Sequence, residues 1–233
     1  MGKGLILITG SGRGLGRDLA LVFADNGYDL ILNGRNQNNL KEVFEEILSK
    51  NVQVSCIPGD IRSLETIAAL TEEAKKGKIS VLINNAGAPT EIRPFENLSY
   101  DEILETIGTN LISPIELTRK IYPLMVSNGG GTIIYINSMI GMECKEQKGI
   151  GCAARWGLRG FTGSLRPEAE KCGIKIISVY PTKIKTRPEY VYGYESEDVA
   201  KRIYRAHESG FSGILKLDGR PKEFRPKRKI EYG

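Results

Sequence analysis

Short apolar runs alternate with amphipathic segments along almost the whole chain. The apolar runs have the length of strands and cover residues 5–10, 28–34, 52–59, 79–87, 131–138, 174–181 and 213–219. The segments between them repeat apolar residues with helical spacing over residues 15–26, 37–50, 63–76, 99–127, 150–172 and 196–209. Strands that alternate with helices indicate βαβ units, so the sequence predicts an α/β fold whose parallel sheet is covered by helices on both faces.

The alternation continues without a linker or an internal repeat to about residue 218. It predicts one domain, residues 1–219, followed by a basic tail, residues 220–233. From Lys216 onward the chain has seven basic and three acidic residues, which accounts for +4 of the net charge of +5. A solvated tail is the favoured interpretation of this charge, and nucleic-acid binding is the weaker hypothesis.

Several simple features restrict where the protein works. No apolar run reaches the roughly 18 residues that span a bilayer, and the apolar N-terminal run is too short for a signal peptide. The four cysteines form no Cys-x-x-Cys pair and the chain has one histidine, so no metal site is predicted. These features favour reduced thiols and a cytoplasmic protein without a membrane partner. His207 is expected at the surface.

A glycine-rich stretch, "TGSGRGLG", follows the first predicted strand and opens the first predicted helix. Its glycines, Gly10, Gly14 and Gly16, let the backbone come close to a ligand, and the helix N-terminus offers free N–H groups to a pyrophosphate. A plain strand-to-helix turn would also use glycine, so this stretch alone does not identify a dinucleotide site.

Further motifs follow this loop in a fixed order. They are "GDI" with Asp60, "NNAG" at residues 84–87, "TNLISP" with Asn110, "INS" with Ser138, "GLRGFTGSLRPE" and "YPTKIKT". Together with the glycine loop they resemble the short-chain dehydrogenase/reductase family over roughly residues 4–218. The resemblance implies a Rossmann-like, doubly wound, seven-stranded parallel sheet and an oxidoreductase that moves hydride between a nicotinamide cofactor and a small carbonyl or alcohol substrate.

The glycine loop and the resemblance together give a set of cofactor-binding residues. The predicted set is Gly10, Ser11, Arg13, Gly14, Leu15, Gly16, Arg35, Asp60, Ile61, Asn85, Ala86, Gly87, Arg155, Pro181, Ile184 and Thr186. The resemblance implies that Asp60 bonds to the adenine amino group and that Pro181, Ile184 and Thr186 hold the nicotinamide end. Thr182 departs from the family pattern, which has glycine after the proline, and its side chain would either crowd the nicotinamide amide or bond to it.

The choice between the two dinucleotides depends on the residues after the second strand. An NAD site places an acid there for the ribose 2′-hydroxyl, whereas this chain has Gly34 followed by Arg35. Arg13 in the glycine loop is a second cation, and guanidinium groups bind a phosphate in bidentate fashion. The sequence therefore predicts NADP(H), with NAD(H) as the alternative.

The expected proton donor is missing. In the family a tyrosine protonates the substrate oxygen and a lysine four residues later lowers its pKa, while a serine and an asparagine complete the site. Ser138 and Asn110 match the last two, but the spacing places Gly151 at the tyrosine position and Arg155 at the lysine position. Glycine donates no proton, and losing a general acid costs roughly 10²–10⁴-fold in rate.

Two functions remain open from the sequence. The favoured one is an NADP(H)-dependent oxidoreductase with an atypical active site, in which another group replaces the acid. Candidate groups are Glu143, Cys144, Lys148, Tyr190, Tyr192 and Tyr194. The alternative is a catalytically inactive pseudo-enzyme that serves as a nucleotide-binding sensor, scaffold or partner subunit. The resemblance also implies a homodimer or homotetramer.

Overall fold

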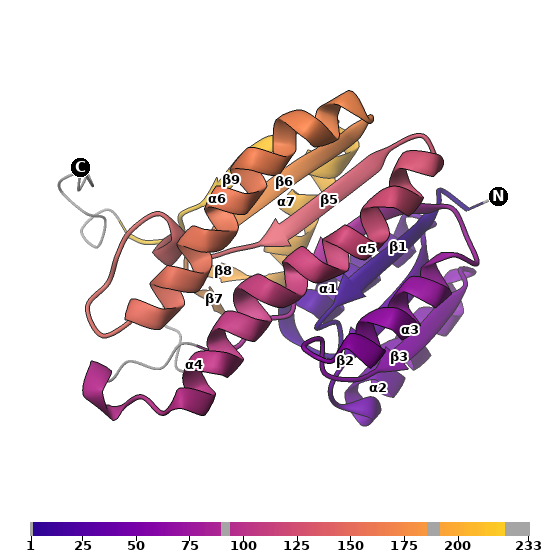
Figure 1. Cartoon of the computed structure of the whole chain (residues 1–233). Coiled ribbons are helices and arrows are strands. Elements are labelled where there is room, and N and C mark those ends of the chain that lie inside the picture. The colour runs from indigo at the N-terminus through magenta and orange to yellow at the C-terminus, as the bar shows by residue number, and fades with distance from the viewer. Residues whose placement is uncertain (1, 90–93, 186–191, 222–233) are drawn as a thin grey trace.

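Seven parallel strands form the central sheet in the order β3-β2-β1-β4-β5-β6-β9 (Figure 1). The structure is a computed structural model that describes residues 2–89, 94–185 and 192–221. The strands are β1 (Leu5–Thr9), β2 (Asp29–Gly34), β3 (Val54–Pro58), β4 (Ile79–Asn84), β5 (Gly131–Ile136), β6 (Ile174–Pro181) and β9 (Gly213–Leu217). The predicted Rossmann-like, doubly wound, seven-stranded sheet is confirmed.

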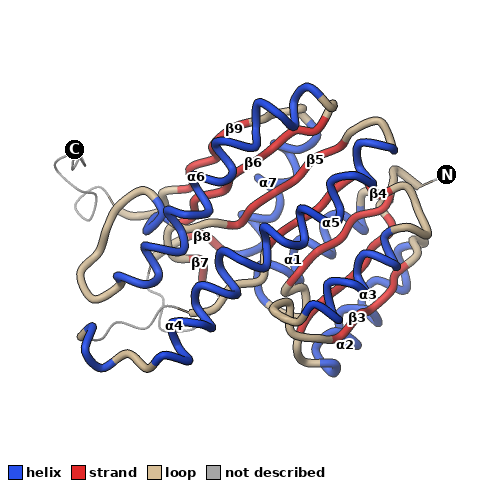
Figure 2. Tube along the Cα trace, viewed as in Figure 1, coloured by secondary structure: helices blue, strands red, loops and turns tan. Residues whose placement is uncertain are grey.

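Helices cover both faces of this sheet (Figure 2). Side chains from α1 (Gly14–Asp25), α2 (Gln37–Ile47) and α7 (Ser196–Glu208) share one hydrophobic core with the sheet. Those from α3 (Leu64–Ala74), α5 (Ser113–Ser127) and α6 (Gly149–Lys171) share the core on the other face. Because each strand alternates its side chains between the two cores, the strands read as continuous apolar runs in the sequence.

The sheet reverses its winding direction between β1 and β4. From β1 the chain adds β2 and then β3 on one side, and from β4 it adds β5, β6 and β9 on the other. The loops that leave the carboxyl ends of β1 and β4 therefore diverge and open a crevice between them. Open α/β sheets bind their ligands at this reversal.

The predicted helix over residues 99–127 is interrupted. The structure has α4 (Tyr100–Ile107), a π-helical turn over Gly108–Ile112, and then α5. In this turn the backbone N–H of Ser113 bonds to the carbonyl of Gly108, five residues back. The apolar spacing of a continuous helix hides such a single wide turn, which frequently accompanies a functional site.

A small second sheet lies outside the predicted elements. It pairs β7 (Ile184–Lys185) with β8 (Tyr194–Glu195) in parallel. Two-residue strands are too short to leave an alternating pattern in the sequence, so periodicity could not predict them. No helix in the described ranges combines the length and apolar character needed to cross a bilayer.

His207 is mostly buried between α7 and the sheet, which corrects its expected surface position. Its side chain is 13% exposed. The ring nitrogens lie 3.0 Å from Thr132 Oγ1 and 2.9 Å from the Tyr28 hydroxyl. Burial lowers the pKa of His207 below its usual range, with nearby Lys175 and Lys3 acting in the same direction and Glu208 opposing them. Only its place near a helix end suggested exposure, and a helix that covers a sheet has one buried side.

This lowered pKa predicts acid sensitivity. The folded state favours neutral His207, so its contribution to the free energy of unfolding is intact above the unfolded pKa of about 6.5 and is lost as the pH falls from there through the lowered folded value. The chain has one histidine, so no other imidazole titrates in this window. Thermal melts between about pH 8 and pH 5 should therefore lose more Tm in the wild type than in His207→Gln. Parallel melting curves for the two proteins would contradict this assignment.

Candidate cofactor and active site

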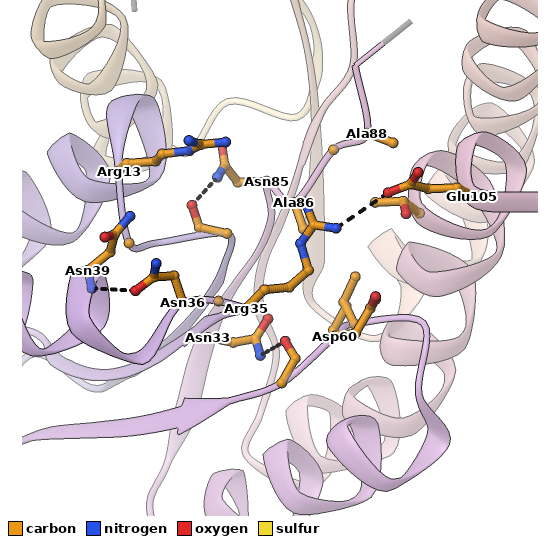
Figure 3. Close-up of a pocket in the computed structure, with 17 residues that line it drawn as sticks. Arg13, Asn33, Arg35, Asn36, Asn39, Asp60, Asn85, Ala86, Ala88 and Glu105 are labelled. Atoms are coloured by element: carbon orange, nitrogen blue, oxygen red, sulfur yellow. Dashed lines mark hydrogen bonds and ion pairs between the residues drawn. The ribbon is translucent and has the colours of Figure 1, made fainter. Parts of the chain in front are cut away.

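A cleft of about 340 Å³ lies at the carboxyl ends of β1, β2 and β4, where the sheet reverses (Figure 3). Its lining includes eight residues of the predicted cofactor set: Gly10, Arg13, Arg35, Asp60, Ile61, Asn85, Ala86 and Gly87. Nine lining residues were not predicted as site residues: Gly12, Asn33, Gly34, Asn36, Asn39, Gly59, Ala88, Glu105 and Thr109. Several of these residues belong to "NGRNQNN", and the position of this stretch at the end of a predicted strand could have indicated that they line the site.

The glycine loop packs tightly against the loop after β4. Gly10 has a φ of +66°, and a Cβ atom there would lie 2.9 Å from Ala86 Cα. A Cβ on Gly16 would lie 2.1 Å from the carbonyl oxygen of Gly10. Asn85 fastens the two loops, because its amide nitrogen donates to the carbonyls of Thr9 at 3.0 Å and Gly10 at 3.1 Å. A side chain at either glycine would push the loops apart.

Two predicted residues of the loop are turned into the protein. Ser11 is fully buried, and its hydroxyl and its backbone N–H both donate to the carbonyl of Asn33, at 3.1 and 2.9 Å. Leu15 is buried in the core beneath α1. Gly14 has a φ of +53° at the first position of the helix. The Ser11 and Leu15 side chains hold the loop in shape, while the backbone of the loop faces the cleft.

The end of the cleft that lies next to β2 and α2 is rich in hydrogen-bond donors. Figure 3 shows Arg13 above Asn36 and Asn39, and Arg35 to their right. The Arg35 side chain is 63% exposed, and its guanidinium lies 3.4 Å from a Glu105 carboxylate oxygen. Asn36 caps α2 by accepting the N–H of Asn39 at 3.0 Å. This end of the cleft therefore offers two guanidinium groups and two amide side chains to an anion.

Asp60 lines the cleft beside this basic end. Its carboxylate accepts the backbone N–H of Arg62 at 2.9 Å and the Arg62 guanidinium at 2.7 Å. Arg62 thereby holds the pKa of Asp60 below its ordinary value, with a further contribution from Arg35. A carboxylate that is ionised at neutral pH can accept a hydrogen bond here from an amino group of a ligand.

Asn110 and Arg155 are brought together behind the loop after β4. Asn110 stands in the π-helical turn, and its side-chain oxygen accepts the Ala88 N–H at 3.0 Å and Arg155 Nη2 at 3.0 Å. Arg155 Nη1 donates to the carbonyl of Ile136 at 2.8 Å. A Cβ on Gly87 would lie 3.1 Å from Arg155 Nη2, so glycine there leaves room for the guanidinium.

The Arg155 guanidinium is desolvated. Burial lowers its pKa to about 10, which still leaves it charged near neutral pH. Its two hydrogen-bond acceptors, the Ile136 carbonyl and the Asn110 side-chain oxygen, are neutral, and within the described residues no carboxylate forms an ion pair with it. A buried cation without a counter-charge is costly, so an electronegative ligand group beside it would be stabilised.

Ser138 and Gly151 complete the predicted catalytic set. Ser138 is half-buried and follows β5, where it begins a short 3₁₀ turn over Met139–Gly141. Gly151 is buried in the first turn of α6. The backbone carbonyl of Arg155 accepts the Asn137 side-chain amide at 3.1 Å, which joins the end of β5 to α6.

Arg220 holds the loop between β5 and α6. Its guanidinium donates to Glu143 at 2.8 Å and to Asp218 at 2.9 Å, and its side chain is 14% exposed. The interpretation of all seven C-terminal basic residues as a solvated tail is therefore wrong for Arg220. It was missed because its two acidic partners lie 77 and 2 residues away, and charge counting carries no pairing information.

Of the three residues predicted to hold the nicotinamide, the structure describes two. Pro181 ends β6 and Ile184 begins β7, while Thr186 lies outside the described residues. The Thr182 hydroxyl accepts the Gly219 N–H at 3.0 Å and lies 3.4 Å from the carbonyl of Leu217. Its side chain thus bonds to the segment after β9. Within the described ranges, no three metal-ligating side chains cluster.

Known proteins are similar to this chain over most of its length. The family model described as "short chain dehydrogenase" matches residues 4–190. An NADP-dependent 3-hydroxy acid dehydrogenase of Schizosaccharomyces pombe is 30% identical over 87% of this chain and 80% of that protein. A sepiapterin reductase of Chlorobaculum tepidum is 30% identical over 79% of each. A ketoacyl reductase of Nostoc is 34% identical over 76% of this chain, which spans 62% of that protein.

Solved structures agree with these relatives. A metagenomic short-chain oxidoreductase in complex with NADP superposes with a TM-score of 0.82 at 25% identity, covering 94% of this chain and 97% of that one. An alcohol dehydrogenase from Thermococcus sibiricus, complexed with 5-hydroxy-NADP, gives a TM-score of 0.86 at 20% identity and covers 96% and 99%, a likeness of fold alone. From its sheet order, its glycine-loop crevice and the family match over most of its length, this chain belongs to the short-chain dehydrogenase family.

Proposed function

We propose that the protein is an NADP(H)-dependent oxidoreductase that moves hydride between the nicotinamide and a carbonyl or alcohol substrate. The observation that carries this proposal is the cleft at the sheet reversal, where Gly10 and Gly16 leave no room for side chains and Arg13 and Arg35 stand at the end next to β2 and α2. The loop backbone would hold the pyrophosphate, and the two arginines a 2′-phosphate. The dehydrogenases and reductases among the relatives support the same activity.

The chemistry at the other end would depend on charge more than on a proton donor. When bound, the nicotinamide supplies or accepts the hydride. Gly151 and Arg155 stand where the family has its tyrosine and lysine, so residue 151 has no proton to give. Ser138 would donate a hydrogen bond to the substrate oxygen, and the Arg155 charge would stabilise negative charge that develops there. A pKa of about 10 keeps the guanidinium charged at neutral pH rather than making it an acid.

The other candidate acids are differently placed. Glu143 accepts a hydrogen bond from the Arg220 guanidinium at 2.8 Å. The ring of Tyr194 lies 4.7 Å from the Arg202 guanidinium, and that of Tyr192 lies 4.9 Å from Lys183 Nζ. Tyr190 lies outside the described residues, and Cys144 is exposed. Lys148 immediately precedes α6, three residues before Gly151.

A pseudo-enzyme that senses or scaffolds through its bound nucleotide is the second candidate function. The observation that favours it is the use of Arg155 as a structural link between Asn110 and the Ile136 carbonyl. These bonds tie α6 to the π-helical turn and to β5 whether or not a reaction takes place. Cofactor binding is common to both functions, so turnover separates them.

We also place the protein in the cytoplasm as a homodimer or homotetramer. The described outer surface of α4 and the π-helical turn supports assembly, because Tyr100, Leu104 and Ile112 are all more than 45% exposed although apolar. Apolar side chains grouped on one helical face commonly mark a protein contact.

Removing the Arg35 guanidinium should weaken NADPH binding selectively. A charge-assisted contact to a phosphate is worth roughly 1.5–3 kcal/mol, so Arg35→Ala should lower NADPH affinity about tenfold or more and leave NADH affinity unchanged. Calorimetric titration of both cofactors gives the comparison. Arg119→Ala removes a guanidinium that is paired with Glu116 on α5, and serves as the matched control. Equal losses for NADPH and NADH would contradict a 2′-phosphate contact.

Restoring the family pair should raise turnover if the native chain lacks a general acid. Gly151→Tyr combined with Arg155→Lys should increase NADPH consumption with aldehyde substrates by roughly 10²–10⁴-fold. Gly151→Phe with Arg155→Lys has similar bulk without the hydroxyl and should give no such gain. Circular dichroism and NADPH titration must first show that both variants fold and bind. A folded, NADPH-binding Tyr/Lys variant no faster than wild type would show that the native site already has its own acid.

Charge at the exposed α4 surface should disrupt the oligomer. Ile112 is 58% exposed, so Ile112→Glu has little effect on folding of the single chain but places a carboxylate in an apolar contact. Size-exclusion chromatography with light scattering should show a smaller species than the wild type. Leu48→Glu, at an equally exposed apolar residue after α2, is the control and should leave the mass unchanged. A monomeric wild type would rule out the proposed assembly.

A further inference from the structure

Three residues in or just before the first turns of α6 share one side of the helix. Lys148, Gly151 and Arg155 follow one another at intervals of three and four residues, which places them on a single helical face. Arg155 shows where this face points, because its guanidinium contacts Asn110 and the Ile136 carbonyl beside the predicted catalytic residues. Lys148 stands at the other end of the same face, immediately before the helix begins.

The charges that act most strongly on the Lys148 ammonium are mainly positive. It is half-buried, and burial is the main cause that lowers its pKa. The charges of Lys145 and Lys183 lower it further, and the Cys152 thiol alone acts in the opposite direction. Within the described ranges no carboxylate lies at ion-pair distance from Lys148. The Lys145 and Lys183 charges therefore add positive potential at Lys148.

The nearest cavity has acids in its lining, and each has a local partner. The cavity of about 80 Å³ is lined by Lys148, Gln147, Gly149 and Ile150 on one side and by Glu102 and Glu105 among others. Glu105 lies 3.4 Å from Arg35, and Glu102 accepts the Ser99 N–H at 2.8 Å in the cap of α4. Neither forms an ion pair with Lys148. The cavity has room for a carboxylate-sized group, and its size excludes a whole substrate.

We propose that the substrate of this site carries an anionic group, such as a carboxylate or sulfonate, which Lys148 binds while the reacting carbonyl lies between Ser138 and Arg155. This inference rests on the proposed oxidoreductase function and names the class of its substrate. Lys183, whose Nζ lies 4.9 Å from the centre of the Tyr192 ring, and Lys145 add positive potential that draws the anion to the start of α6. Lys148 would then be a specificity-determining residue.

An anion bound at Lys148 changes the role of that ammonium. A negative charge beside an ammonium stabilises its charged form and so opposes proton loss. Lys148 in contact with a substrate anion is thus a binding group, and it does not supply the proton that Gly151 lacks. The two roles predict different kinetics, because loss of a binding group weakens affinity and loss of an acid slows the chemical step.

Matched aldehydes test the proposal. Binding of 4-carboxybenzaldehyde, 4-formylbenzenesulfonate and the neutral methyl 4-formylbenzoate would be measured by calorimetry with and without saturating NADP. The anionic aldehydes should bind about tenfold more tightly than the ester, and Lys148→Gln should abolish this difference. Lys148→Arg should restore it, which excludes a mere folding defect. Lys171→Gln, which removes a solvent-exposed ammonium from the opposite end of α6, should leave the difference unchanged.

The outcomes separate this proposal from the function on which it rests. Equal binding of the anionic aldehydes and the ester, or a Lys148→Gln variant that keeps the full difference, would overturn the anion site. A protein that prefers the anions but never binds NADP or consumes NADPH would retain the site and lose the oxidoreductase function. Tighter binding of the carboxylate than of the sulfonate would show that the site prefers the planar oxyanion. Equal binding of the two would show that it accepts either shape, and each of these results supports the anion site.

Discussion

Everything at the cofactor cleft depends on how closely two backbone segments approach at the carboxyl ends of β1 and β4. Gly10 and Ala86 are so near that a single Cβ atom at residue 10 would meet Ala86 Cα at 2.9 Å. Asn85 holds this approach with two hydrogen bonds from one amide nitrogen, and Thr9 Oγ1 accepts the N–H groups of Asn85 and Ala86, both at 3.0 Å. The open backbone of the glycine loop, on which a phosphate would lie, is a consequence of this contact.

The second constraint is the Arg155 charge. An amine and a guanidinium differ in shape, because the planar guanidinium donates in fixed directions and reaches two acceptors at once. Arg155 uses this to join the Ile136 carbonyl to Asn110, so it fastens three elements, β5, α6 and the π-helical turn. The same side chain is thus a brace for the fold and a fixed positive charge near the predicted substrate oxygen.

The sequence predicted the fold well for a physical reason. Strands buried on both faces must be apolar throughout, and the helices between them must be apolar on one side, so β1 and α1 are recognisable from their letters alone. The glycine positions were also predictable, since Gly10 and Gly14 adopt positive φ and Gly16 has no room for a Cβ. The order and spacing of the motifs also predicted that Asn110 and Arg155 belong to one site, and the two side chains are in contact in the structure. These features follow from local chemistry or from a fixed family order.

What the sequence did not reveal depends on distant partners. His207 looked exposed because nothing local shows that Thr132 and Tyr28 close over it. Arg220 looked like part of a solvated tail because Glu143 is 77 residues away. The π-helical turn was hidden because one wide turn changes the apolar spacing by a single residue. In each case the deciding interaction joins residues that only the folded chain brings together.

The position of the unpaired charges argues for a site adapted to its substrate rather than a damaged one. A helix face with no anionic ligand to bind would be expected to carry neutral or solvated residues, since desolvating a cation is costly. Instead α6 has a desolvated guanidinium at Arg155, and a half-buried ammonium at Lys148 immediately precedes the helix, so the two cations lie on either side of Gly151 in the sequence. Cations held in such places without described carboxylate partners are stabilised when a ligand brings the opposite charge. Electrostatic binding of an anionic substrate at Lys148 would then orient it for hydride transfer, and the Arg155 charge would stabilise the oxyanion that develops.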